Sequence, residues 1–477
     1  MNQERCAIGV IGMAVMGQNL ALNIARKGFS TAVFNRTTAV TEKFHQERVQ
    51  GEPVFPAKTM EEFVALLEPP RKVLLMVKAG EAVDAFIGKL ILLLQKGDLL
   101  IDAGNSHFTD TDRRIAEAEK QGFLFLGTGV SGGEAGALHG PSIMPGGHER
   151  GYLLAGPILE QAAAQVDGGA CCAYLGPRSA GHFVKMVHNG IEYAFMQALA
   201  EGYDLLHKVG GISTSRCADI FGEWNTRENL ASYLTEITAA VLSHHDEDTG
   251  KPLVELILDQ AEQKGTGKWT TQTALDLGVP TPLINQAVMA RSLSSYSGKR
   301  KSLSSLYPTP LPVSNDSPDK DELIKDLEQA LFLAQVCAFS EGFQLLESAS
   351  GEFGYGLDLS TVARIWKGGC IIRSALLPHI EHAYSKLHPP LLLADPVLVP
   401  RIREALPPLR KVVALAAHHG VPVPCLGAAL FSLDSWGAGI LPTNLIQAQR
   451  DYFGAHTFRR RDKEGVFHEQ WEKGDAQ

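Results

Sequence analysis

Over the first 180 residues, short apolar runs alternate with longer stretches of helical periodicity. Each apolar run is bounded by glycine or charged residues and has the length of a buried parallel strand. The predicted strands are residues 6–11, 31–34, 73–77, 99–101 and 123–126. Helical patterns such as residues 19–27 and 112–121 lie between them. This alternation predicts a Rossmann-type, doubly wound α/β sheet.

After about residue 180 the strand-like runs nearly vanish and helical patterns dominate. The predicted helices are residues 182–208, 228–242, 251–264 and 319–348. Residues 292–318 are rich in Ser, Pro and Lys, which predicts a surface excursion. The chain is thus predicted to be α/β + α, with three parts. These are a cofactor-binding Rossmann-type domain (1–180), a large all-helical substrate and dimerisation domain (181–440) and a polar C-terminal tail (441–477).

Composition narrows the possible classes of protein. The net charge of -9 gives no basic excess that would favour nucleic-acid binding. The most apolar stretch, residues 90–94, is far too short to cross a bilayer, and the first predicted strand leaves no room for a targeting segment. The seven cysteines form no Cys-x-x-Cys pair, so neither a zinc site nor a disulfide framework is expected. We therefore expect a cytoplasmic protein without membrane or nucleic-acid partners.

A glycine-containing turn follows the first predicted strand and opens a helix. Gly12 permits the tight turn, the small Ala14 lets the backbone approach a pyrophosphate, and Gly17 allows close packing of helix and strand. An ordinary tight turn is the alternative, but the position in an α/β pattern favours dinucleotide binding. The predicted contacts are Gly12, Met13, Ala14, Val15, Met16 and Gly17.

The end of the second strand favours NADP over NAD. A site that prefers NAD usually has an acidic residue here, whereas this chain has Asn35, Arg36 and Thr37. Arg36 can bind the extra phosphate of NADP and stack on adenine, and its neighbours can add hydrogen bonds. The alternative is that Arg36 is a solvated surface residue.

Two further strand ends complete the predicted cofactor site, because open α/β sheets bind ligands at the carboxyl ends of their strands. Val77, Lys78 and Ala79 follow the third predicted strand, and Asn105 follows the fourth. Asn105 is placed to bridge cofactor and substrate, or alternatively to form a turn or helix cap.

The helix predicted after residue 180 carries a polar stripe. Lys185, His188, Asn189 and Glu192 follow the spacing i, i+3, i+4 and i+7, so they share one helical face. Buried charges are tolerated where they pair with each other or with a substrate. The stripe is therefore a candidate catalytic site, and a solvated polar face is the alternative.

Other segments are candidates for binding an anion. In the run Ser131-Gly132-Gly133, and in Pro145-Gly146-Gly147, successive glycines free backbone N–H groups to bind a carboxylate or hydroxyl closely, and a flexible hairpin is the alternative. The segment from Lys264 to Lys268 lacks the full phosphate-loop pattern, so ATP use is not expected. The candidates for binding a phosphate monoester are Lys264, Thr266, Arg291, Arg450 and His456.

These segments together resemble the decarboxylating 6-phosphogluconate dehydrogenases over almost the whole chain. The matching strings are GMAVMGQNL from Gly12, NRT from Asn35, FVKMVHNGIEY from Phe183, GTGKWT from Gly265, GGCIIRS from Gly368 and NLIQAQRDYFGAHT from Asn444. The resemblance implies oxidation and decarboxylation of 6-phospho-D-gluconate to ribulose 5-phosphate with NADP, in the pentose phosphate pathway and without a metal.

The resemblance also implies residue roles. Lys185 matches the family's catalytic lysine and Glu192 matches its acid. The positions that match contacts to the sugar acid are Asn105, Ser131, Gly132, Gly133, His188 and Asn189. The positions that match contacts around its phosphate end are Tyr193, Lys264, Thr266, Arg291, Arg450 and His456. The family is homodimeric, so Arg450 and His456 in the tail are expected to act in the partner's site.

The chain departs from the family pattern at two places. Ala135 replaces a glutamate after the Ser-Gly-Gly-Glu run, and Ala194-Phe195 replaces Gly-Asp after Tyr193. Two rival hypotheses remain at this point. One is a different β-hydroxyacid dehydrogenase, such as an enzyme for hydroxyisobutyrate. The other is a catalytically silent NADP-binding protein.

Overall fold

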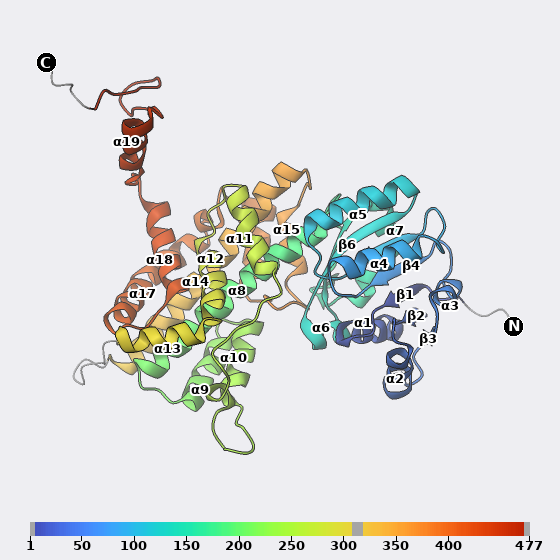
Figure 1. Ribbon diagram of the computed structural model, residues 1–477. Coiled ribbons are helices and arrows are strands. Elements are labelled where there is room, and N and C mark those ends of the chain that lie inside the picture. The colour runs from blue at the N-terminus through green and yellow to red at the C-terminus, as the bar shows by residue number, and fades with distance from the viewer. Residues whose placement is uncertain (1–4, 308–317, 472–477) are drawn as a thin grey trace. The chain divides into compact units, whose positions relative to one another are not determined.

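The computed structural model describes residues 5–307 and 318–471, in two compact units, Met1–Ala428 and Ala429–Gln477. The first unit contains a sheet with its covering helices, followed by a large helical part (Figure 1). The second unit contains the end of a helix, a further helix and an irregular segment. Each unit is described by itself.

The sheet of the first unit has seven strands in the order β3-β2-β1-β4-β5-β6-β7. The pairs from β3 to β6 are parallel, and β7 is antiparallel to β6. The order 3-2-1-4-5-6 is that of dinucleotide-binding Rossmann folds, so the predicted fold class is confirmed. The strands are β1 (Ile8–Ile11), β2 (Thr31–Phe34), β3 (Val54–Pro56), β4 (Lys72–Leu75), β5 (Leu99–Asp102), β6 (Leu124–Ser131) and β7 (Ser142–Gly147).

Helices cover both faces of this sheet, and each face has its own core. One core includes Leu20, Phe44 and Ile158, and the other includes Phe63 and Ile115. Fully buried strands flanked by helices on both sides are typical of parallel sheets. The helices are α1 (Val15–Arg26), α2 (Thr38–Arg48), α3 (Met60–Ala65), α4 (Glu81–Leu90), α5 (Phe108–Gln121), α6 (Gly133–His139) and α7 (Glu149–Ala162).

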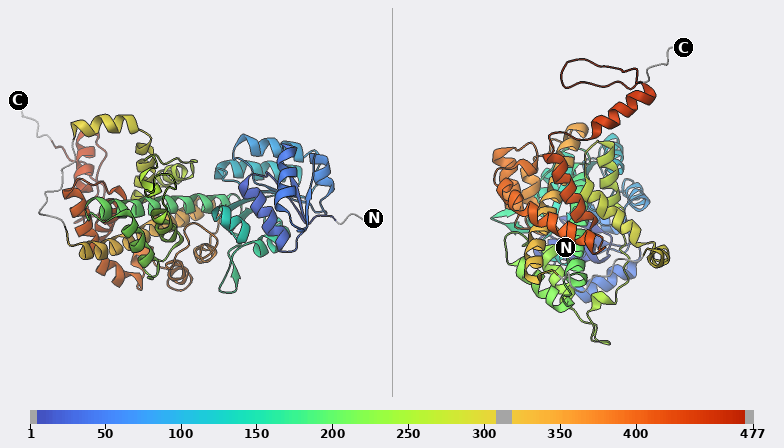
Figure 2. Two further views of the ribbon diagram at one scale, coloured as in Figure 1. Left: turned by 90° about the horizontal axis from the view of Figure 1, so that it is seen from below. Right: turned by 90° about the vertical axis from the view of Figure 1, so that its left-hand side faces the viewer.

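Helix α8 (Ala180–Lys208) runs from the sheet into the helical part (Figure 2). It packs on β6 and β7 and also against α14, α11 and α12. The helices that follow it are α9 (Thr214–Asn225), α10 (Tyr233–Ser243), α11 (Thr266–Asp276), α12 (Pro282–Ser294), α13 (Ser297–Leu306), α14 (Lys320–Phe353), α15 (Leu359–Ile365), α16 (Leu377–His382), α17 (Leu398–His418), α18 (Pro424–Gly437) and α19 (Thr443–Gly454).

Three sequence predictions differ from the structure. The strands β3 and β7 were not predicted. Residues 251–264 were predicted to be helical, but only a 3-10 turn, Leu253–Glu255, forms there. Residues 292–318 were predicted to be a surface excursion. They lie on the surface as far as residue 307 but largely as helix α13, and residues 308–317 lie outside the described part.

All seven cysteines are buried and free, including the adjacent Cys171 and Cys172. Within residues 5–307 and 318–471, every helix is too short or too polar to cross a membrane.

Candidate active site

The turn after β1 has the geometry that a dinucleotide requires. Gly12 has φ +103°, and an added side-chain carbon there would lie 2.4 Å from the Met76 carbonyl oxygen. At Gly17 the same carbon would lie 1.8 Å from the Gly12 oxygen, so both positions require glycine. Helix α1 begins at Val15 without a side-chain cap, and Ala14 and Val15 are exposed. Its first N–H groups are therefore available to a pyrophosphate, and the residues present fit the cofactor.

The predicted residues at the end of β2 divide between two roles. The Asn35 Oδ1 accepts a hydrogen bond from the Met13 N–H at 3.2 Å, so this side chain braces the glycine turn. Arg36 and Thr37 are exposed. Arg36 has no ion-pair partner among the described residues, and this leaves its guanidinium available to a phosphate.

The loops after β4 and β5 contact each other. A side-chain carbon at Gly104 would lie 3.0 Å from the Val77 carbonyl oxygen. Lys78 and Asn105 are exposed, and Ala79 is half-buried. The structure therefore brings together the two strand ends that the sequence analysis selected.

Helix α8 approaches β6 and β7 at closely packed glycines. A carbon added at Gly181 would lie 2.3 Å from the Gly127 oxygen and 2.2 Å from the Met144 oxygen. A carbon added at Gly129 would lie 2.4 Å from the Lys185 Cβ. Glycines thus allow the polar face of α8 to lie directly against the end of β6.

That face carries a continuous hydrogen-bonded network. The Lys185 Nζ donates to the Asn189 Oδ1 at 2.6 Å, and the Asn189 Nδ2 donates to the Thr266 Oγ1 at 3.0 Å. The His188 Nε2 lies 3.0 Å from the Ser131 Oγ, and its Nδ1 lies 3.1 Å from the Asn189 Oδ1. A neutral imidazole satisfies both contacts if Nδ1 donates and Nε2 accepts. Lys185, His188 and Asn189 of the predicted stripe are therefore buried and joined to β6 and α11, while the Glu192 side chain is 21% exposed. The stripe as a whole is not a solvated face.

Burial changes the proton affinities of this face. Burial lowers the pKa of Lys185 below 10.5, although nearby Glu192 and Cys370 oppose the change. Burial also holds the pKa of His188 well below 6.5, and Lys185 adds to this effect. Burial raises the pKa of Glu192 above 4.5, against the opposing charges of Lys185 and Arg291. A lysine that loses its proton easily beside a carboxyl that keeps one is suited to acid–base catalysis.

The next turns of α8 place further predicted residues. The Glu192 Oε2 lies 3.8 Å from the His188 Nδ1. Tyr193 is buried, and the Arg291 guanidinium lies 3.4 Å from the centre of its ring in a cation–π contact. Both residues of the departure Ala194-Phe195 are buried, so they pack in the interior of the helical part.

Two other predicted segments lie beside this face. Lys264 is exposed, and Thr266 is the first residue of α11 after Gly265, whose φ is +102°. Gly132 and Gly133 have positive φ and lead into α6, where an added carbon at Gly132 would lie 2.5 Å from the Gly369 oxygen. Gly146 and Gly147, by contrast, are buried in β7, so the predicted anion-binding or flexible turn at these residues was wrong.

The remaining two predicted residues, Arg450 and His456, belong to the second unit. Both are exposed, and they flank the buried Asp451. The Asp451 carboxylate accepts hydrogen bonds from the Thr457 N–H, the His468 ring, the Glu469 N–H and the Trp471 indole. Burial would raise its pKa, but these donors outweigh burial and lower the pKa to about 2. One carboxylate thus orders the segment that carries His456.

Some neighbours of the polar face were not singled out from the sequence. The Trp366 ring lies edge-on to the His188 ring at 5.6 Å, and the Ser131 Oγ accepts a 3.4 Å hydrogen bond from the Ile371 N–H. The string GGCIIRS around Cys370 was noted, but residue spacing gave it no place near Lys185. The sequence does not indicate that position 129 must be glycine, because the need for Gly129 arises only from the contact with α8.

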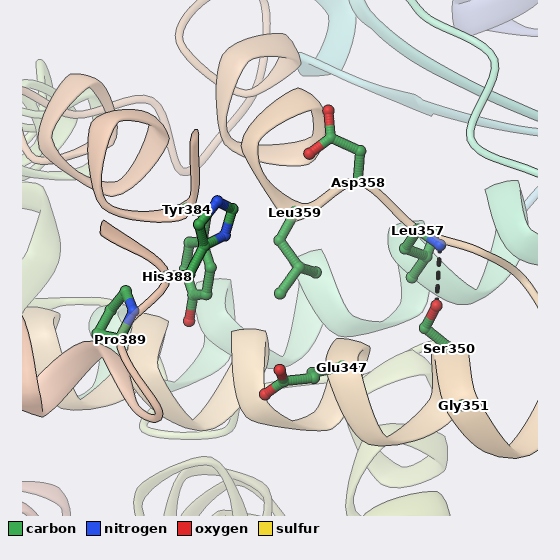
Figure 3. A pocket seen from close by; sticks show the side chains of 9 residues that line it. All are labelled: Glu347, Ser350, Gly351, Leu357, Asp358, Leu359, Tyr384, His388 and Pro389. Carbon is green, nitrogen blue, oxygen red and sulfur yellow. Dashed lines mark hydrogen bonds between the residues drawn. The ribbon is translucent and has the colours of Figure 1, made fainter. Parts of the chain in front are cut away.

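A pocket of about 360 Å³ lies elsewhere in the helical part (Figure 3). None of the predicted site residues lines it. Its walls include Glu347, Asp358, Tyr384 and His388. The Tyr384 ring also stacks on the Phe343 ring. The part of the chain that the structure describes contains no group of three or more His, Cys, Asp or Glu side chains that could hold a metal ion.

Two family models match the chain. The NAD binding domain of 6-phosphogluconate dehydrogenase matches residues 7–176, and the C-terminal domain of 6-phosphogluconate dehydrogenase matches residues 181–471. The chain is 51% identical over 468 residues to the NADP(+)-dependent, decarboxylating 6-phosphogluconate dehydrogenase of Bacillus subtilis, covering 98% of this chain and 99% of that one.

Similar relatives come from distant organisms. The decarboxylating 6-phosphogluconate dehydrogenase 1 of Saccharomyces cerevisiae is 46% identical over 94% of this chain and 92% of its own. The solved structure of Plasmodium falciparum 6-phosphogluconate dehydrogenase superposes with a TM-score of 0.94 at 41% identity, over 98% of this chain and 100% of that one. That protein is known in complex with NADP+ and in complex with 6-phosphogluconate. With this likeness in sequence and fold over nearly its full length, the chain belongs to the 6-phosphogluconate dehydrogenase family.

Proposed function

We propose that this chain oxidises and decarboxylates 6-phospho-D-gluconate to D-ribulose 5-phosphate and carbon dioxide with NADP. The proposal is carried by the buried network in which Lys185, His188 and Asn189 of α8 are joined to Ser131 at the end of β6. When bound, NADP supplies the hydride acceptor for the substrate's C3 carbon. The glycine turn and the exposed Arg36 support this cofactor. Further support comes from the relative of Bacillus subtilis, which is named as NADP(+)-dependent, and from the Plasmodium falciparum enzyme, which is known in complex with NADP+.

Lys185 is the base and then the acid at the substrate's C3 oxygen. Its neutral amine takes the hydroxyl proton as the hydride leaves C3, which gives a 3-keto acid. The resulting ammonium returns this proton to the same oxygen as the C1–C2 bond breaks and carbon dioxide leaves. The lowered pKa of Lys185 favours the neutral amine at the start.

Glu192 completes the reaction as a proton donor. Breaking the C1–C2 bond leaves an enediol. The Glu192 carboxyl protonates the carbon that lost carbon dioxide, and the neutral Lys185 amine takes the proton of the C3 hydroxyl, which gives the ketone. Its raised pKa keeps it protonated to higher pH than an ordinary glutamate. Ser131, Gly132, Gly133, His188, Asn189 and Asn105 hold the sugar acid in this proposal. Tyr193, Lys264, Thr266, Arg291, Arg450 and His456 surround its phosphate.

Arg450 and His456 act in the partner's site of a homodimer in this proposal. The second unit exposes large apolar side chains, among them Phe431, Trp436 and Phe453, and such surfaces typically mark protein interfaces. We further propose the division into a Rossmann-type domain (1–180), a helical domain (181–440) and a tail (441–477), and a cytoplasmic location.

Substrate comparison tests the proposed function. The protein should reduce NADP with 6-phosphogluconate and fail to do so with gluconate or 3-hydroxyisobutyrate, because the proposed site surrounds a phosphate. Equal turnover of gluconate would contradict the phosphate contacts. NADP binding without turnover of any sugar acid would favour a silent cofactor-binding protein.

Substituting Arg36→Ala should reduce the preference for NADP. A hydrogen bond to a charged group contributes about 1.5–3 kcal/mol, so kcat/KM for NADP should fall roughly 10- to 100-fold. The value for NAD should fall less, since NAD lacks the phosphate and loses only the stacking of Arg36 on adenine. Steady-state kinetics with both cofactors measure the ratio, and a parallel loss for NAD and NADP would contradict the assignment.

The pH dependence of kcat/KM should have two limbs. Activity should rise as pH increases through the lowered pKa of Lys185, which must be neutral. It should fall as pH increases through the raised pKa of Glu192, which must be protonated. Glu192→Gln should remove the falling limb and keep the rising limb, with activity about 10²- to 10⁴-fold lower. A variant that retains both limbs would remove Glu192 from the role of acid.

A further inference from the structure

A buried arginine outside the predicted site contacts both loops that carry cofactor-binding residues. Arg114 lies on α5 and is 2% exposed. Its Nη2 donates to the Gly80 carbonyl oxygen at 3.1 Å, at the end of the loop after β4. Its Nη1 donates to the Ser106 Oγ at 3.1 Å and the Asp102 Oδ2 at 3.3 Å, in the loop after β5.

This guanidinium uses its full hydrogen-bonding capacity. The Arg114 Nε and Nη2 also donate to the two Asp84 carboxylate oxygens, at 2.8 and 3.1 Å. These contacts occupy all five N–H donors of the side chain. Its planar fork therefore holds Gly80, Asp84, Asp102 and Ser106 in one fixed arrangement.

The loop after β5 is fixed further by its own residues. The Asp102 carboxylate accepts from the Gly104 N–H at 3.1 Å and from the Ser106 Oγ at 2.6 Å. These two bonds bracket Asn105, whose side chain is exposed. The orientation of Asn105 thus depends on a carboxylate that Arg114 in turn anchors.

The same face of α5 also contacts α8, the helix that carries Lys185. Thr111 lies three residues before Arg114, and its Oγ1 is 2.7 Å from the His182 Nδ1. His182 is buried on α8, one turn before Lys185. Helix α5 therefore sets the position of Asn105 through Arg114 and the start of the lysine helix through Thr111.

We infer that Arg114 is a positioning residue that holds the loops after β4 and β5 in register with Lys185. It acts through Gly80, Asp102 and Ser106, and it touches neither cofactor nor substrate. For the effect of Arg114 on turnover, the inference rests on the proposed function. The effect of Arg114 on NADP binding is independent of the substrate.

Neighbouring Arg113 offers a matched control. Its guanidinium contacts the same Asp84 carboxylate at 3.0 Å, together with Glu117, but it is exposed and reaches neither loop. Arg113→Lys and Arg114→Lys both keep the charge and remove the fork. A lysine ammonium is a single point of donation and cannot span both loops.

The test compares Arg114→Lys, Ser106→Ala and Arg113→Lys with the wild-type protein. Calorimetric titration gives the Kd for NADP, steady-state assays give kcat and KM, and thermal unfolding gives Tm. Arg114→Lys should lower kcat roughly 10- to 100-fold and raise the Kd for NADP, since a misplacement of about 1 Å can cost 100-fold. Ser106→Ala should show a smaller loss of the same kind. Arg113→Lys should leave kcat and Kd within about twofold.

The outcomes separate positioning from a purely structural role. If Arg114→Lys lowers Tm but leaves kcat and the Kd for NADP equal to those of Arg113→Lys, the inference is overturned. If Arg114→Lys does not fold, Ser106→Ala decides, and unchanged kcat and Kd in that variant would overturn the inference. If the wild-type protein does not turn over 6-phosphogluconate, the proposed function fails, and the Kd comparison still tests the arginine.

Discussion

Lys185→Met should lower kcat by about 10²- to 10⁴-fold, the range typical of losing a general acid–base group. Methionine lacks the amine but keeps an unbranched apolar stem, so the packing of its Cβ and Cγ against Gly129 is retained. The buried Asn189 Oδ1 loses its 2.6 Å donor, but the cofactor turn is untouched. Calorimetric titration should therefore show NADP binding near the wild-type value beside the lost turnover.

Lys208→Met is the matched control on the same helix. Lys208 is exposed at the end of α8, where its Nζ contacts the Asp204 carboxylate at 2.9 Å. Such surface pairs contribute little to stability, and Lys208 is remote from the polar face. Its substitution should leave kcat unchanged. If Lys185→Met retained more than about a tenth of the wild-type kcat, Lys185 would not be the base.

Gly129→Ala should impair both stability and turnover, although it changes no polar group. The added carbon would lie 2.4 Å from the Lys185 Cβ and 3.2 Å from the Gly181 carbonyl oxygen, so α8 must move. Overpacking of this kind typically costs about 1–3 kcal/mol of unfolding free energy. A displaced Lys185 should lower kcat by roughly 100-fold. Urea unfolding and steady-state kinetics measure the two effects.

Gly222→Ala is the control for Gly129→Ala. Gly222 lies within α9, and an added carbon there meets no atom within 4 Å. Alanine is favoured over glycine inside a helix by about 0.5–1 kcal/mol, so this variant should be slightly stabilised and fully active. A fully active and stable Gly129→Ala would show that α8 does not require a glycine at this contact.

The Rossmann-type fold was predictable because its central strands are buried on both faces and are therefore almost purely apolar. Strand β7 was not, because Pro145, Gly146 and Gly147 lack the apolar pattern. Its glycines are required by contacts with other parts of the fold. A carbon at Gly146 would lie 2.4 Å from the Gly181 nitrogen, which is a contact between residues distant in sequence.

The helix predicted for residues 251–264 does not form, because its apolar residues are not buried. The apolar spacing was suitable, but Leu256, Ile257 and Leu258 are all exposed. Most helical stability comes from packing one apolar face, and this segment has no such buried face. Hydrogen bonds from the Leu253 N–H to the His244 oxygen and from Asp246 to Lys251 form a turn there instead.

The polar face of α8 was predictable from residue spacing, because helical periodicity alone places Lys185, His188, Asn189 and Glu192 on one side. Its contacts with Ser131 and Thr266 were not predicted, since they join segments 57 and 77 residues away in sequence, and only the family resemblance placed these residues around one substrate. Arg114 was not predicted, because its partners come from two other segments, residues 80–84 and residues 102–106. Residue spacing predicts which side chains share one face of a helix. Tertiary contacts decide which residues of other segments that face contacts.

Counting NADPH and carbon dioxide in one reaction tests the central claim most directly. The purified protein would be given 6-phosphogluconate labelled at C1, with NADPH followed by absorbance and released carbon dioxide by its label. We predict one molecule of carbon dioxide for each NADPH, and formation of both products by Lys185→Met that is about 10²- to 10⁴-fold slower. NADPH formed without carbon dioxide, or no turnover by the wild-type protein, would contradict the proposed oxidative decarboxylation.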